Sequence, residues 1–446
     1  MYDAELVDSY ERRFTAILDR TEPVKVNGKV TDVIGMVIIS MGPNVSLGDV
    51  CTITDRSGKE VCKTEVVGFK DGKVLSVALG EVEKISQMCE IKAEGKSFKI
   101  GVGDALLGRV LDGLGNPIDG KGEVVTSSSR VIYAEPPNPL ERQRISEPLQ
   151  TGVRAIDGLL TCGKGQRIGI FAGSGVGKSV LLGMIARNTS ADVNVIVLVG
   201  ERGREVREFI EKDLGEEGLS RSVLIISTSD KSALLRMKAA HIGTTIAEYF
   251  RDQGKDVVLM MDSVTRFAMA QREIGLTIGE PPTTKGYTPS VFAVLPKLLE
   301  RAGNSKHGSI TGFYTVLVDG DDMNEPIADA VRSILDGHIV LSRKIAHKGQ
   351  YPAIDILQSI SRVMPDIVTK SHRDRVIAFK DILATYNEAE DLVNIGAYVK
   401  GSNPAIDHAL TKINTLRTYL KQDMLEKSLL HEAAQKLNTI IEQPIV

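Results

Sequence analysis

Short, almost wholly apolar runs alternate with longer segments of helical periodicity through the middle of the chain. These runs predict strands at residues 167–171, 193–199, 223–227, 257–261 and 310–318. Strands buried on both faces read as continuous apolar runs, and their alternation with helices is typical of a parallel sheet. We therefore predict an α/β fold whose central, mostly parallel sheet domain spans residues 94–369.

A different pattern precedes this domain. Residues 24–93 hold about six short β-rich runs broken by Gly and Asp, with Asp71-Gly72 as a hairpin signal between two of them. Short strands at this spacing predict a small closed β-barrel. Residues 108–120 are rich in Gly, Asp and Pro and predict a connector into the sheet domain.

After the sheet domain the strand pattern stops. Residues 375–386 and 404–437 have helical spacing and predict a C-terminal helical domain over residues 370–446. The acidic stretch 387–391 fits an ordinary solvated helix turn.

The N-terminal residues 1–23 predict a separate amphipathic helix. Their apolar side chains recur at helical spacing opposite charged positions: Leu6, Tyr10, Phe14, Ile17 and Leu18. Such a helix would either dock a partner or cap the barrel domain.

Composition narrows the class of protein. The chain has 446 residues, no Trp, 4% aromatic residues and a net charge of −3, which gives little support to a nucleic-acid-binding surface. Its four cysteines form no Cys-x-x-Cys pair, so we expect buried, reduced thiols in a cytoplasmic protein. No apolar run is long enough to span a bilayer, so any membrane association would come through partners or a surface helix.

The first predicted strand of the sheet leads into a glycine-rich turn, Lys178-Ser179 and a helical segment. This order predicts a phosphate-binding loop, because glycines let successive backbone N–H groups converge on an anion at the helix N-terminus. Lys178 is expected to reach the β- and γ-phosphates of ATP, and the Ser179 hydroxyl to hold Mg²⁺. The usual first Gly is Ala172, a small residue that suffices at a strand end. The predicted nucleotide-binding residues of this loop are Ala172, Gly173, Ser174, Gly175, Val176, Gly177, Lys178, Ser179 and Val180.

Two further predicted strands end in carboxylates. Asp262 closes the run 257–261, and Glu201 follows the run 193–199. In a parallel sheet both would reach the edge where ligands bind, so we expect Asp262 to organise the Mg²⁺ water shell and Glu201 to polarise the attacking water. Arg202 and Arg204 would add positive charge near the phosphates. Each feature alone also fits a turn-capping Asp or a charged loop, and the phosphate-binding loop favours the catalytic interpretation.

Several segments together resemble the rotary ATP synthase α/β superfamily, and specifically the flagellar and type III secretion export ATPases. They are residues 108–120, 139–167, 172–180, 200–206, 262–267, 279–290 and 351–362. The resemblance covers nearly the whole chain and implies a RecA-like sheet domain between the barrel and the helices. It implies that Glu201 is the catalytic glutamate, where the non-catalytic α subunit has Gln. The chain would then hydrolyse ATP, not merely bind it as a structural subunit.

The resemblance also implies roles for four other residues. Tyr351 would stack on adenine, Arg266 would lie near the γ-phosphate, Glu205 would join the magnesium water network, and Arg362 would be an arginine finger that reaches a neighbour's site. One chain would then carry both halves of a catalytic site, which implies a homohexameric ring with six equivalent sites.

The resemblance further implies a Mg-dependent ATPase that powers flagellar protein export. Implied partners are a regulatory stator-like protein, a coiled-coil central stalk protein, export chaperones with their substrates, and a membrane export gate. The implied location is the cytoplasmic side of the membrane, peripherally bound at the export apparatus. A virulence-type secretion ATPase is the alternative, and residues 20–26 and 391–398 favour the flagellar branch. A hexameric nucleic-acid translocase is more remote, because the barrel region has only Phe69 and Phe98 as aromatic residues.

Overall fold

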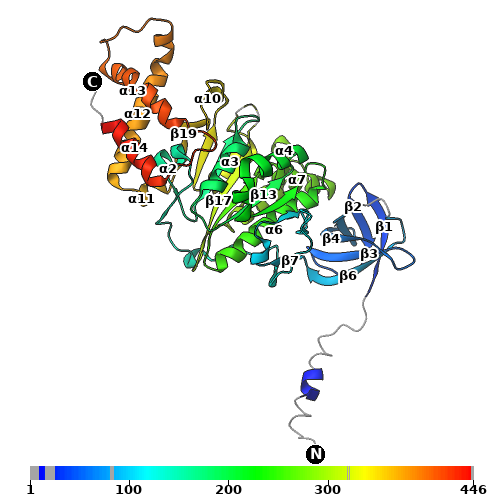
Figure 1. The fold of residues 1–446 in the computed structure, drawn as a ribbon. Helices are drawn as coiled ribbons and strands as arrows, with labels where there is room; N and C mark the ends of the chain where they lie inside the picture. Colours follow the sequence, from blue (N-terminus) through cyan, green and yellow to red (C-terminus); the bar gives the residue numbers. More distant parts are fainter. Residues whose placement is uncertain (1–9, 16–25, 81–84, 319, 321, 443–446) are drawn as a thin grey trace, which may run out of the picture. The chain divides into compact units, whose positions relative to one another are not determined.

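A computed structural model describes residues 10–15, 26–80, 85–318, 320 and 322–442 of the chain. Its described residues divide into two compact units, with the division between Phe98 and Lys99 (Figure 1). Each unit has its own hydrophobic core. Residues 10–15 are helical and expose Tyr10 and Phe14, and the rest of the predicted N-terminal helix lies outside the described residues.

The first unit contains the predicted barrel. Within its described residues six strands close in the order β1-β2-β5-β4-β3-β6. The strands are β1 (Gly28–Ile34), β2 (Val37–Met41), β3 (Asp49–Thr54), β4 (Glu60–Lys70), β5 (Lys73–Ala78) and β6 (Glu90–Ser97). The predicted hairpin is confirmed, because Lys70 pairs with Lys73 and both turn residues, Asp71 and Gly72, have positive φ. Cys51, Cys62 and Cys89 are buried in the barrel core.

The second unit is built on a mostly parallel sheet, as predicted. Its described strands follow the order β19-β18-β12-β17-β15-β13-β14-β8, with β16 (Gly303–Asn304) beside β17. Their bounds are β8 (Val110–Asp112), β12 (Arg167–Ala172), β13 (Val193–Val199), β14 (Ser222–Ser227), β15 (Asp256–Asp262), β17 (Ser309–Leu317), β18 (Gly337–Leu341) and β19 (Ile354–Ser361). Pairing from β18 to β8 is parallel, so these strands share one carboxyl edge.

Both margins of this sheet differ from the sequence-based expectation. Part of the predicted connector, β8, pairs with β14 as an edge strand, and the Asp119 carboxylate braces it by accepting the Arg109 guanidinium at 2.7 Å. At the other edge β19 runs antiparallel to β18. These two margin strands are short or partly exposed, so neither carries the continuous apolar run of the central strands.

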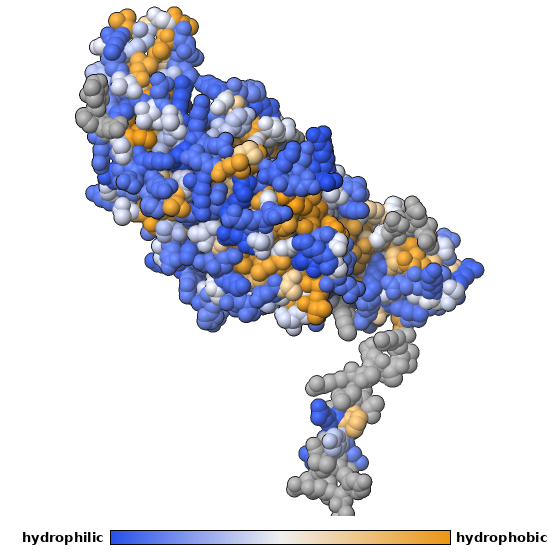
Figure 2. Space-filling model, viewed as in Figure 1, coloured by the Kyte–Doolittle hydropathy of each residue, from blue (hydrophilic) through white to orange (hydrophobic). Residues whose placement is uncertain are grey.

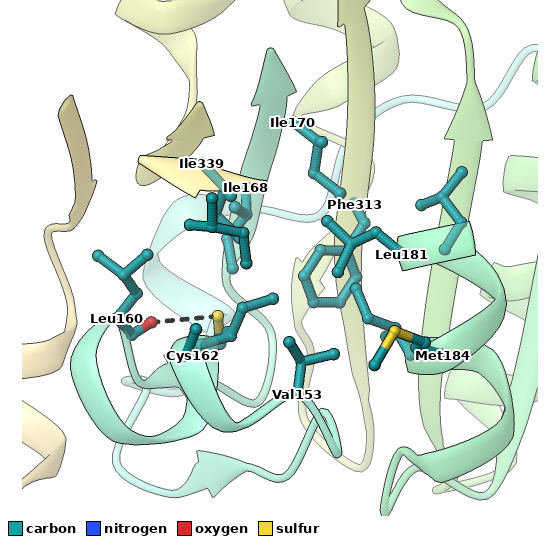
Figure 3. Packing of buried hydrophobic residues seen from close by; sticks show 14 of the residues in the cluster. Val153, Leu160, Cys162, Ile168, Ile170, Leu181, Met184, Phe313 and Ile339 are labelled. Carbon is teal, nitrogen blue, oxygen red and sulfur yellow. Dashed lines mark hydrogen bonds between the residues drawn. The ribbon is translucent and has the colours of Figure 1, made fainter. Parts of the chain in front are cut away.

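Helices cover both faces of the sheet. The main ones are α3 (Lys178–Asn188), α4 (Gly203–Glu208), α6 (Ala233–Asp252), α7 (Val264–Thr277), α8 (Pro289–Leu299), α9 (Pro326–Ile334) and α10 (Arg343–His347). Leu181 and Met184 of α3 pack on Ile168 and Ile170 of β12 and on Phe313 of β17 (Figure 3). Because this contact fixes α3 to β12, the turn that joins them is held at both ends.

The C-terminal part of the chain is helical, as predicted, with α12 (Lys370–Asn394), α13 (Pro404–Leu420) and α14 (Leu430–Glu442). Residues 404–437 do not form one helix. The break after Leu420 follows from tertiary contacts: Arg154 of α2 (Arg154–Leu159) donates to the carbonyls of Tyr419 and Lys421, at 2.9 and 2.5 Å. The acidic stretch 387–391 lies inside α12, where Glu390 pairs with Lys348 at 2.7 Å. This stretch, where the family resemblance implies a pore-facing acidic loop, is therefore helical.

None of the described helices combines the length and the apolar character needed to cross a bilayer.

Candidate nucleotide-binding and catalytic site

The predicted phosphate-binding loop forms the turn between β12 and α3. Ala172 ends β12 and is buried, which explains why a small side chain is accepted there. Gly175 and Gly177 have φ values of 76° and 91°, a backbone region that favours glycine. Lys178 and Ser179 begin α3, whose first N–H groups and positive dipole end face the same turn. The geometry is that of an anion cradle.

Two neighbouring strands bring carboxylates to this edge of the sheet. Asp262 is the last residue of β15 and lies level with Leu198 of β13, and Glu201 follows the end of β13. Both side chains are largely buried. The sequence-based placement of these two residues agrees with their position in the structure.

Lys178 joins the two carboxylates. Its ammonium contacts Asp262 Oδ1 directly, and its Nζ lies 3.6 Å from Glu201 Oε1. Thr315 of β17 also donates its hydroxyl to Asp262 Oδ1 at 2.7 Å. Asp262 is thus held from two sides, which fixes its carboxylate at the edge of the sheet. Sequence patterns gave no signal for Thr315, because its role depends on β15 and β17 lying side by side.

Burial and the nearby charge of Asp262 raise the pKa of Glu201 to about 7, against the opposing effect of Lys178. A hydrogen bond between the carboxyl groups of Glu201 and Glu205 lowers the pKa of Glu205. Glu201 Oε1 is buried and accepts no hydrogen bond from any described residue. A pKa close to neutral and an unoccupied acceptor suit a group that takes a proton from water.

The predicted arginines divide into two groups. Arg266 reaches the cluster, because its Nε lies 3.5 Å from Glu201 Oε1 and its guanidinium donates to the carbonyl of Gly200. Arg202 and Arg204 do not reach it. Their side chains are 78% and 87% exposed and pair along the surface of α4 with Glu205 and Glu208.

Tyr351 lies beside the phosphate-binding loop. A Cβ built on Gly177 would be 3.7 Å from the Tyr351 ring, and the residue is 50% exposed. Its carbonyl accepts the backbone N–H of Gln422 at 2.9 Å, from the break between α13 and α14. Gln422 was missed by sequence reasoning, since it falls inside a segment predicted to be helical.

Arg362 lies at the amino ends of the parallel strands, opposite the carboxyl ends where the phosphate-binding loop lies. It follows the end of β19, and its backbone N–H donates to the carbonyl of Asp336 at 3.0 Å, beside Arg167 at the start of β12. From Arg167 to Ala172, the two ends of β12, a strand rises about 17 Å, so Arg362 lies about that far from the phosphate-binding loop of the same chain. The exposed guanidinium lies 3.3 Å from the carbonyl of Leu335. The structure therefore does not bring Arg362 to its own Lys178.

The donor set suits a magnesium ion that is held jointly with a nucleotide. No described cluster of three or more His, Cys, Asp or Glu side chains could enclose a metal by itself. Mg²⁺ usually keeps several waters and takes one or two protein oxygens together with substrate phosphates. The hydroxyl of Ser179 at the start of α3, the fixed carboxylate of Asp262 and Glu205 beside Glu201 fit that pattern.

Comparison with known families gives two matches along the chain. Residues 152–361 match the ATP synthase alpha/beta family, nucleotide-binding domain. Residues 368–439 match the T3SS EscN ATPase C-terminal domain. The first match contains the phosphate-binding loop and the two carboxylates at the strand ends, Glu201 and Asp262.

Relatives extend the similarity over nearly the full length. The flagellum-specific ATP synthase of Bacillus subtilis is 57% identical over 95% of this chain and 97% of that protein. The type 3 secretion system ATPase of Xanthomonas euvesicatoria is 52% identical over 93% of this chain and 94% of that protein. The assembled ATPase EscN of the enteropathogenic E. coli type III secretion system has a TM-score of 0.88 and 48% identity, over 93% of this chain and all of that one. The chain belongs to the ATP synthase alpha/beta family, in the branch of the flagellar and type III secretion ATPases.

Proposed function

We propose that this chain hydrolyses ATP to ADP and phosphate and thereby energises protein export by the flagellar type III secretion apparatus, as a ring of six identical subunits. The observation that carries the proposal is the convergence of Lys178, Glu201 and Asp262 at the mouth of the phosphate-binding loop. A mere nucleotide-binding module would not need a carboxyl group poised near neutral pH at this place.

Each residue of the site has a defined task in this reaction. Backbone N–H groups from Gly173 to Ser179 bind the phosphates, and Lys178 leaves its carboxylate contacts to pair with the β- and γ-phosphates. Glu201 accepts a hydrogen bond from the attacking water and so orients a lone pair of the water oxygen toward the γ-phosphorus. Arg266, already beside Glu201, stabilises charge that develops on the γ-phosphate.

Magnesium fits the same site. Ser179 would ligate Mg²⁺ directly, and Asp262 and Glu205 would hold its water ligands. When bound, the ion neutralises charge on the β- and γ-phosphates. Tyr351 would cover the adenine base, because its exposed ring lies over the end of the phosphate-binding loop.

The position of Arg362 supports a ring. An arginine about 17 Å from its own loop along β12 cannot complete its own site, but a head-to-tail neighbour can receive it. An interface between two unlike faces closes into a ring when the rotation is right. The solved EscN relative is described as an assembled ATPase, which agrees with such an assembly.

The flagellar branch is favoured over the virulence branch. Flagellum-specific ATP synthases from Bacillus subtilis, Treponema pallidum and Salmonella typhimurium are 57%, 50% and 50% identical to the chain. The secretion ATPase of Xanthomonas euvesicatoria reaches 52%, so the virulence role is the second candidate. Secretion of flagellar hook protein by a deletion strain that carries this gene would separate the two roles, because a dedicated virulence ATPase would not restore it.

The proposed partners follow from exposed surfaces and relatives. EscN has been solved in complex with its central stalk EscO, and we propose a coiled-coil stalk protein for this chain. The end of the helical part, where α12 leads into α13, exposes Leu392, Ile395 and Val399 (Figure 2). The other proposed partners are a stator-like regulator, export chaperones with their cargo, and the membrane export gate. Together these partners would hold the ring at the inner face of the membrane.

The first test is ATPase activity as a function of protein concentration, with the mass of the particle measured in parallel. Activity per chain should rise steeply as monomers become hexamers and should require Mg²⁺. Constant activity from a monomer would contradict sites completed by a neighbour's Arg362.

A further inference from the structure

Arg362 follows directly on β19, and one buried amide braces the backbone that carries it. Gln166, between β11 (Cys162–Gly163) and β12, has no exposed surface. Its Nε2 donates to the carbonyl of Asp336 at 3.1 Å and to the hydroxyl of Ser361 at 3.0 Å. The same Asp336 carbonyl accepts the backbone N–H of Arg362 at 3.0 Å. Gln166 therefore binds both Ser361, which precedes Arg362 in the chain, and the Asp336 carbonyl, which accepts the Arg362 N–H.

The remaining polar atoms of this network are also paired. Gln166 Oε1 accepts the N–H of Gly163 at 2.9 Å, and the Ser361 hydroxyl donates to the carbonyl of Thr161 at 2.9 Å. A buried network whose members all have partners holds a single geometry, because every alternative leaves a polar group unpaired. The start of β12 and the end of β19 are locked together in this way.

Packing and charge stiffen the same corner. A Cβ on Gly337 would lie 2.5 Å from the carbonyl of Ile360, so β18 and β19 approach as closely as a glycine permits. Arg167 forms a double contact with the carboxylate of Asp336, with Nε to Oδ2 and Nη2 to Oδ1 both 3.0 Å. The side chain of Arg362 is different, because the residue is exposed and its guanidinium contacts the carbonyls of Leu335 and Arg332 at long distances, 3.3 and 3.5 Å.

We propose that Gln166 is a positioning residue for Arg362: through Ser361 and Asp336 it fixes the point from which the guanidinium reaches the nucleotide of the neighbouring subunit. This inference rests on the proposed role of Arg362 across the subunit interface. Gln166 itself lies directly before the start of β12, at the opposite end of that strand from the phosphate-binding loop of its own chain. A displacement of a catalytic group by about 1 Å can lower turnover about a hundredfold, so such a brace has a measurable effect.

The variant Gln166→Met keeps the length of the side chain and removes its hydrogen bonds to the Asp336 carbonyl and the Ser361 hydroxyl, together with the one it accepts from the Gly163 N–H. We expect turnover of the assembled ring to fall at least about tenfold, with the KM for ATP unchanged. Ser361→Ala removes the hydroxyl that accepts from Gln166 and donates to Thr161 but keeps the bond between Gln166 and Asp336, so it should give a smaller loss in the same direction. Ser361→Thr keeps the hydroxyl and should retain most of the turnover. A Gln166→Met ring of normal mass and normal turnover would overturn the proposal, as would a raised KM without a loss of turnover.

Mixed rings separate positioning from general damage. Lys178→Ala subunits cannot hydrolyse ATP but still offer an intact Arg362. In a random 1:1 ring with Gln166→Met subunits, half of the sites keep Lys178 and half of those face an intact arginine, so activity should reach about one quarter of wild type. If Gln166→Met damages its own site instead, mixing restores nothing and the proposal fails.

The control pair is Arg362→Ala mixed with Lys178→Ala. Recovery in this pair but not with Gln166→Met would overturn the positioning role alone. Absence of recovery in the control pair would overturn the arginine's action across the interface, and with it the proposed ring mechanism. If Gln166→Met does not assemble, Ser361→Ala takes its place in the same mixing experiment and is judged by the same outcomes.

Discussion

Lys178 and Glu201 approach within 3.6 Å between Nζ and Oε1, although one begins a helix after β12 and the other follows the end of β13. In the proposed reaction, ATP would exchange this ion contact for one between Lys178 and the phosphates, which would free Glu201 to interact with water.

Glu201→Gln should abolish most hydrolysis and preserve ATP binding. The amide keeps the size of the side chain but cannot accept a proton, and loss of a general base typically costs about 10²–10⁴-fold in rate. Single-turnover hydrolysis and nucleotide binding measure the two effects. The matched control is Glu208→Gln, at the surface of the adjacent α4, which should hydrolyse ATP normally. Full turnover of Glu201→Gln would remove Glu201 from the reaction.

Arg362→Ala should leave ATP binding nearly intact and lower turnover by roughly a thousandfold, the range of a lost arginine finger. In the proposed ring, its guanidinium acts only on the transition state of the adjacent subunit. Arg204→Ala is the control, because Arg204 is also exposed but pairs with Glu208 on the surface of α4. Normal turnover in a hexameric Arg362→Ala protein would contradict the role across the interface.

Tyr351→Ala should raise the KM for ATP about tenfold, since stacking of a base on an aromatic ring contributes about 1–3 kcal/mol. Tyr351→Phe keeps the ring and should behave like the wild type, as long as the backbone contact with Gln422 persists. Titration with ATP and with a triphosphate lacking the base measures the difference. Equal losses for both ligands would show that the ring does not contact adenine.

The stability of the second unit should depend on pH through His241. Burial and the nearby Arg301 and Lys238 lower its pKa from 6.5 to about 3. Between pH 6.5 and 3, His241 is protonated in the unfolded chain but not in the folded chain. The free energy of unfolding therefore falls as the pH drops through this range, by up to about 1.4 kcal/mol per pH unit. Urea unfolding at pH 7.0 and about 5.5 measures this loss.

His241→Gln should flatten that pH dependence, because the amide does not titrate in this range. His431→Gln, a change at an exposed histidine in α14, should keep the wild-type dependence. The same slope in His241→Gln and wild type would mean that another group governs the acid sensitivity.

The sequence predicted those parts of the fold and site that local chemistry determines. Continuous apolar runs gave the central strands, and the glycines before Lys178 gave the anion cradle, because both depend on neighbours along the chain. Asp262 and Glu201 could be placed because parallel strands share an edge. These predictions needed no knowledge of which helix covers which strand.

The remaining features depend on tertiary contacts. The segment after Leu420 has a helical composition, yet Arg154 and Gln422 bind its backbone and side chains to the sheet domain and end the helix. Gln166 reads as an ordinary polar residue in a turn. The role of Gln166 becomes apparent only in the fold, where its amide donates a hydrogen bond to Ser361, a residue far along the chain.

The opposite placement of the phosphate-binding loop and Arg362 on one sheet has a consequence for the cell. Under the proposed mechanism, a newly made subunit that has not met its neighbours would bind ATP without the arginine that completes the site, and so would not turn it over. Assembly of the ring would then switch hydrolysis on, and unassembled copies would not consume ATP. The arrangement would tie energy use to the place where cargo is exported.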